Sequence, residues 1–159
     1  MSSSSQSGTR ASDRQTDVQK AAKLVGIVFL AVGVLGFIPG ITTNYDAMEF
    51  AGHQSEAKLL GLFQVSILHN IVHLLYGVAG LVLAKTINGA KKYFLVGGIV
   101  YLVLFVYGLA VPMNSDANFV PVNGADNVLH LVLGLGMIAL GALLTRRPGL
   151  DRATDVANH

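Results

Sequence analysis

Long apolar runs separated by short polar segments dominate the chain between residues 21 and 144. The runs cover residues 21–41, 59–84, 93–111 and 127–144. Each is close to the roughly 20 residues that a helix needs to cross a hydrocarbon core of about 30 Å. A helix on the surface of a soluble domain keeps a polar face, which these runs lack. The pattern therefore predicts an all-α fold, a polytopic membrane four-helix bundle.

Polar segments flank this region at both ends. Residues 1–20 are Ser-rich and lack hydrophobic periodicity, so we expect a disordered N-terminus. Residues 146–159 form a polar tail, which leaves 21–145 as the transmembrane domain. The first run is too long for an ordinary signal peptide and no small-residue cleavage site follows it, so we interpret it as a retained helix.

Composition narrows the class of protein. Apolar residues make up 52 % of the chain and charged residues 13 %, about half the roughly 25 % charge of a soluble domain. Cysteine is absent, which excludes disulfides, thiolate metal ligands and a cysteine nucleophile. These figures argue against a soluble enzyme and against a disordered chain.

The positions of the cations predict orientation. Ten of the eleven Lys and Arg residues fall in the N-terminal segment, the connection after the second run and the C-terminal tail. With four crossings these segments share one side, and only Lys58 lies on the other. The positive-inside rule makes the basic side cytoplasmic, so we expect a multi-pass inner-membrane protein with both termini inside. Membrane orientation explains the basic pI, and we expect no nucleic-acid partner.

The connections carry weaker local signals. The latter half of the loop 42–58 suits a short interfacial helix that leads into the second run. Asn88-Gly89 is a turn signal, and Asp126 stands where the N-cap of the fourth helix is expected.

The second and fourth runs share the pattern N-x-x-H-L-x-x-G. It appears in HNIVHLLYGVAGL (69–81) and in DNVLHLVLGLGMI (126–138), where it aligns Asn70 with Asn127, His73 with His130 and Gly77 with Gly134. The first and third runs match more weakly, as VLGFIPG and VYGLAVP. We infer two duplicated two-helix units in parallel arrangement, related by an axis along the membrane normal.

Polar and small residues of these runs fall on one helical face. On the second run they are Ser66, His69, Asn70, His73, Gly77, Gly80 and Ala84, and on the fourth Asp126, His130, Gly134, Met137 and Gly141. Such residues face the protein interior in membranes, because lipid satisfies no polar group and small residues allow close helix approach. The lipid bilayer is the expected partner, and the Gly-rich faces also suit a homo-oligomer or another membrane protein.

The histidine motif allows a structural interpretation and two alternatives with cofactors. In the structural one, Asn70 and Asn127 hydrogen-bond between the two copies and no cofactor is needed. In the second, His69 and His73 at i, i+4 join Asp126 and His130, also at i, i+4, as four ligands of a transition metal. In the third, His73 and His130 are the axial ligands of a haem.

Catalytic motifs are missing from the sequence. It contains no G-x-S-x-G, no P-loop and no H-E-x-x-H. The sequence therefore names no catalytic residue and favours a non-enzymatic scaffold, accessory subunit or small-ligand binder. The alternative is a metal- or haem-binding redox protein that uses the paired histidines.

Three segments resemble the domain of unknown function family 4383. They are VGVLGFIPGIT, LLGLFQVSILHNIVHLLYGVAGL and VNGADNVLHLVLGLG, and the resemblance covers roughly residues 21–145. It implies a bacterial four-helix membrane protein of unassigned activity. It implies no substrate, cofactor or catalytic residue.

Overall fold

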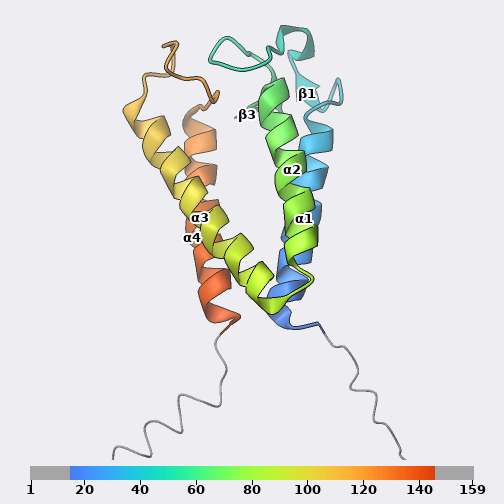
Figure 1. The fold of residues 1–159 in the computed structure, drawn as a ribbon. Coiled ribbons are helices and arrows are strands. Elements are labelled where there is room, and N and C mark those ends of the chain that lie inside the picture. Colours follow the sequence, from blue (N-terminus) through green and yellow to red (C-terminus); the bar gives the residue numbers. More distant parts are fainter. Residues whose placement is uncertain (1–14, 146–159) are drawn as a thin grey trace, which may run out of the picture.

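The computed structural model describes residues 15–145 and is mostly helical (Figure 1). Its four helices are α1 (Asp17–Leu35), α2 (Ile67–Leu83), α3 (Ile87–Ala110) and α4 (Gly124–Leu143). By length and composition, α1, α3 and α4 are apolar and long enough to cross a membrane, and α2 is an apolar helix of 17 residues. The predictions for segments 1–14 and 146–159, including Arg10, Arg14, Arg146, Arg147 and Arg152, fall outside the described residues.

A small sheet replaces the first two turns of the predicted second helix. Strands β1 (Thr42–Thr43), β2 (Lys58–Leu59) and β3 (Phe63–Gln64) pair antiparallel in the order β1-β2-β3. Between β2 and β3, Leu60 and Gly61 have φ of 54° and 70°. Two successive residues in the left-handed region make a tight turn and cannot continue a helix. The prediction that helix begins at residue 59 is therefore wrong, and the all-α description omits this sheet.

The capping residues explain where helices begin. The Ser66 side chain accepts a hydrogen bond from the amide of His69, which starts α2 at Ile67. Thr86 caps α3 in the same way through the amide of Gly89, so the predicted Asn88-Gly89 turn is the first turn of a helix. In the loop 42–58 the only helical turn is the 3-10 helix η1 (Tyr45–Ala47), in its first half, so the predicted interfacial helix is wrong.

The N-cap of α4 is Asn123, and Asp126 is the third helical residue. The Asn123 side chain accepts from the amide of Asp126 at 3.0 Å, and Oδ2 of Asp126 accepts from the amide of Asn123 at 3.0 Å. This reciprocal pair is a capping box, which satisfies two amides at the helix start. The prediction of Asp126 as N-cap is therefore displaced by three residues.

Helix α1 packs along α2 through glycines. A Cβ on Gly77 would lie 2.8 Å from the carbonyl oxygen of Gly26 and 2.6 Å from Cγ of Leu30. Nearer the loops, the side chain of Asn70 occupies the space that a Cβ on Gly36 would need. The absence of side chains at these glycines lets the two backbones approach closely.

Helix α3 packs along α4 by the same kind of contact. A Cβ on Gly98 would lie 2.8 Å from the carbonyl oxygen of Gly134, and one on Gly134 would lie 2.7 Å from Cδ2 of Leu102. The side chain of Asn127 fills the space beside Gly108. Each asparagine therefore packs within its own helix pair.

The two helix pairs meet at the end that carries the connection between α2 and α3, and they separate toward the other loops (Figure 1). At the closed end, Nε2 of Gln19 donates to the carbonyl oxygen of Ala84 at 3.0 Å, and Phe94 and Ala22 are fully buried. Large apolar side chains point outward from all four helices; examples are Leu24, Leu75, Val103 and Val132.

The loops at the open end are hydrogen-bonded to each other. The amide of Gly52 donates to the carbonyl oxygen of Phe119 at 2.8 Å, and Nδ2 of Asn123 donates to that of Leu62 at 2.9 Å. The amide of Gln64 donates to Oδ2 of Asp126 at 3.1 Å. The last two contacts join the β-hairpin formed by β2 and β3 to the start of α4, at the open end of the space between the helix pairs.

Candidate functional site

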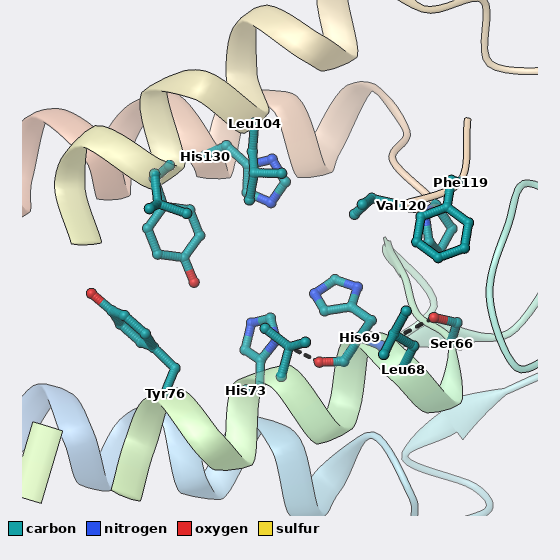
Figure 2. A pocket seen from close by; sticks show the side chains of 13 residues that line it. Ser66, Leu68, His69, His73, Tyr76, Leu104, Phe119, Val120 and His130 are labelled. Carbon is teal, nitrogen blue, oxygen red and sulfur yellow. Dashed lines mark hydrogen bonds between the residues drawn. The ribbon is translucent and has the colours of Figure 1, made fainter. Parts of the chain in front are cut away.

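Three histidines line the space between the helix pairs at the open end. His69 and His73 lie one turn apart on α2, with ring centroids 4.4 Å apart. His130 projects from α4, and only 4 % of its surface is exposed. Figure 2 shows His69, His73 and Tyr76 along one side of the space and His130 across from them. The structure therefore brings together the three histidines that the sequence singled out.

Each helix pair supports its own imidazole with an aromatic ring. Phe29 of α1 lies 5.4 Å from His73, and Tyr101 of α3 lies 5.5 Å from His130, both centroid to centroid and with interplanar angles of 44° and 45°. Phe29 and Tyr101 also stack on each other at 5.8 Å. The two aromatic rings join the imidazoles of both pairs into one cluster.

The sequence analysis did not single out Phe29 or assign Tyr101 a role in the site. A signal for both is present in the chain. The segment GIVFL (26–30) of α1 matches GIVYL (98–102) of α3, and the two aromatic residues hold the same place in it. In both helices this match begins eight residues before the weaker match VLGFIPG and VYGLAVP.

Two cavities adjoin the histidines. One has a volume of 240 Å³ and lies between α2, α3 and the loop 119–121 (Figure 2). Its walls are formed by Ser66, Leu68, His69, Val72, His73, Tyr76, Val100, Tyr101, Leu104, Phe119, Val120, Pro121 and His130. The other has a volume of 230 Å³ and reaches α1, α4 and the β-hairpin. The three histidines and Tyr101 form walls of both cavities, and most of the remaining lining is apolar.

The hydrogen bonds of the imidazoles differ. Nδ1 of His73 lies 3.0 Å from the carbonyl oxygen of His69. Because a carbonyl oxygen only accepts, Nδ1 carries the proton, and Nε2 of an uncharged His73 is left with a free lone pair. Nδ1 of His69 and Nδ1 of His130 are buried and have no partner among residues 15–145. A bare nitrogen is less costly to bury than an unpaired N–H, so this arrangement favours a proton on Nε2 of those two rings.

Hydrogen bonds hold the Asp126 carboxylate at the start of α4. Its Oδ2 already accepts from the amides of Gln64 and Asn123, which directs the carboxylate to the start of α4. Within residues 15–145, no group of three or more His, Asp or Glu side chains is placed to hold a metal ion. The predicted ligands His69, His73, Asp126 and His130 all line one cavity, of 230 Å³, and the four-ligand metal site stays a prediction.

Asn70 and Asn127 form no hydrogen bond from one helix pair to the other. Both are buried, Asn70 lies against Gly36, and Asn127 against Gly108, each within its own pair. Nδ2 of Asn70 lies 3.9 Å from Sδ of Met48, and Oδ1 of Asn127 has no partner among the described residues. The predicted hydrogen bonds of Asn70 and Asn127 between the helix pairs are therefore not formed among the described residues.

The haem interpretation of His73 and His130 stays a prediction. Both imidazoles line both cavities, as axial ligands require. No Lys or Arg of the described chain lines either cavity, so no side chain there is placed to pair with the propionates of a haem.

Comparison with known proteins gives one match. No curated protein and no solved structure matches the chain. A family model described as Domain of unknown function (DUF4383) matches residues 19–143. That match takes in all of α2, α3 and α4 and nearly all of α1. The chain therefore belongs to the DUF4383 family.

Proposed function

We propose that this protein is a non-enzymatic membrane protein that binds a small, largely apolar ligand between its two helix pairs. The observation that carries the proposal is the 240 Å³ cavity, whose apolar walls converge on three histidines. Ligand sites are concave, mostly apolar and equipped with a few polar groups that fix orientation. A scaffold or accessory subunit would not need such a cavity beside imidazoles, two of which have no partner for Nδ1 among the described residues.

The membrane location rests on the outward faces and on the charges. Leu24, Leu75 and Val103 are each more than 60 % exposed, as expected for side chains that contact lipid. Lys85 and Lys91 flank the closed end, whereas Lys58 lies in the hairpin at the open end. By the positive-inside rule all four helices cross a bacterial cytoplasmic membrane, with both termini and the closed end in the cytoplasm.

Duplication of a two-helix unit accounts for the matched contacts. Gly26, Phe29, Leu30 and Gly36 of α1 correspond to Gly98, Tyr101, Leu102 and Gly108 of α3 at constant spacing. Their contacts correspond as well: glycine on glycine at the crossing, aromatic ring on imidazole, and asparagine against glycine. The N-caps Ser66 and Asn123 also stand at equivalent places before the shared motif. We take the four helices to be a bundle of two parallel copies, with the cavity at the interface between them.

Native mass spectrometry of the protein in lipid nanodiscs tests the binding function. Leu104 lines the cavity, and the next residue on one side, Val103, is 61 % exposed on the outer face of α3. We expect the wild type and Val103→Trp to retain a co-purified small molecule and Leu104→Trp to lose it, because the indole fills the cavity. Equal occupancy in the two variants, or none in the wild type, would contradict the proposal. A Soret band in the purified protein would replace it with the haem alternative.

A further inference from the structure

Exposed apolar side chains border the 240 Å³ cavity, and we take the space between two of them to be its mouth. Val72 of α2 and Val100 of α3 line it and are 51 % and 49 % exposed. Both belong to the outward faces that contact lipid in the proposed orientation. A ligand that passes between them comes from the bilayer, so it is lipid-soluble and its apolar tail can remain in the mouth.

The polar groups of this cavity form a mixed set of donors and acceptors. Nε2 of His73 offers a lone pair, because Nδ1 donates to the carbonyl oxygen of His69. A proton on Nε2 is favoured for His69 and His130, because Nδ1 of each ring is buried and has no partner among residues 15–145. His69 and His73 are adjacent, with ring centroids at 4.4 Å. A hydroxyl group is complementary to such a pair, since it donates to one imidazole and accepts from the other.

The cavity walls also favour a ring. Tyr76, Tyr101 and Phe119 contribute aromatic side chains to the lining. Aromatic groups pack on one another in offset or edge-to-face arrangements that add stability beyond the area they bury. The remaining walls are mainly aliphatic, and none of the described wall residues carries a cationic Lys or Arg side chain. An anionic headgroup would therefore find no partner there.

We infer that the ligand is a membrane-soluble phenol or hydroquinone, whose hydroxyl donates to Nε2 of His73 and accepts from Nε2 of His69. This inference rests on the proposed binding function and specifies the chemical class of ligand. The ring lies between the aromatic walls, and its aliphatic tail leaves between Val72 and Val100. His130 faces the ring from the other helix pair.

Three probes that share one tail test the inference in nanodiscs. They are decylhydroquinone, kept reduced, its dimethyl ether, which accepts but cannot donate, and decylbenzene, which does neither. We expect the hydroquinone to bind about tenfold more tightly than the ether, since one hydrogen bond to a buried group is lost. In His73→Phe the hydroquinone and the ether should bind equally, while in His53→Phe, a histidine of the loop outside both cavities, the tenfold difference should persist.

The outcomes separate the ligand class from the binding function. If decylbenzene binds and Leu104→Trp excludes it, but the hydroquinone gains nothing over the ether, the ligand class is wrong and the binding function stands. If no probe binds in a manner that Leu104→Trp abolishes, both are wrong. If His73→Phe preserves the tenfold difference, the assigned hydrogen bond is wrong and the inference falls with it.

Discussion

The glycine crossing between α1 and α2 allows a stability prediction from geometry alone. In Gly77→Ala, the added Cβ would lie 2.8 Å from the carbonyl oxygen of Gly26, 2.8 Å from the amide nitrogen of Leu30 and 2.6 Å from its Cγ. Non-bonded carbon atoms rest at about 3.5–4.0 Å. Two of the three close atoms are backbone, so relief requires the helices to move apart rather than a side chain to rotate.

The magnitude follows from two opposing effects. Overpacking a well-packed core costs about 1–3 kcal/mol. Alanine in a helix interior is favoured over glycine by about 0.8–1.0 kcal/mol, which offsets part of that cost. We therefore expect Gly77→Ala to lower the free energy of unfolding by up to about 2 kcal/mol. Gly134→Ala should be similar or milder, because its Cβ would lie 3.1 Å from the carbonyl oxygen of Gly98.

Unfolding in mixed micelles of increasing SDS content, followed by circular dichroism, measures this difference. Gly136→Ala is the matched control, because it lies in α4 and a Cβ there meets nothing within 4 Å. It should be neutral or stabilising. If Gly77→Ala were as stable as Gly136→Ala, the close approach of the two helices, and the reasoning from it, would be refuted.

Two further predictions concern topology and the hairpin. Because the chain has no cysteine, Asn88→Cys and Ser115→Cys each provide a single site for labelling. A membrane-impermeant maleimide should modify the cysteine at position 115 in intact cells and the cysteine at position 88 only after lysis. The opposite result would reverse the orientation. Asp126→Asn weakens the two hydrogen bonds that backbone amides donate to this carboxylate. The amide of Gln64 should therefore exchange with solvent about tenfold faster, as measured by hydrogen-exchange mass spectrometry. Asp116→Asn, at an exposed position, is the control and should leave that rate unchanged.

Hydropathy and motif spacing predicted much of this fold. A long apolar run needs helix to satisfy its backbone in lipid, so the helices follow from composition. The spacing of Asn, His and Gly in α2 and in α4 was enough to place His69, His73 and His130 on inward faces, where the structure has them.

The remaining features depend on contacts that are distant in sequence. Leu59 and Phe63 look like the start of a helix, but a turn at Leu60 and Gly61 folds them into strands. Asp126 resembled a metal ligand or an N-cap, because only tertiary packing brings the amide of Gln64 to the carboxylate oxygen Oδ2 of Asp126, which accepts its hydrogen bond. Asn70 contacts Gly36 only because α2 runs back beside α1. A local sequence pattern does not predict this contact.

The most direct test of the binding site is nuclear magnetic resonance of the wild-type protein with isotope-labelled histidine in nanodiscs. Titration with decylbenzene places an aromatic ring beside the imidazoles if the cavity is the ligand site. We predict that the ring resonances of His73 and His130 shift with saturation while those of His53, in the loop outside both cavities, stay fixed. Unchanged resonances at His73 and His130, or equal shifts at His53, would contradict a ligand site between the helix pairs.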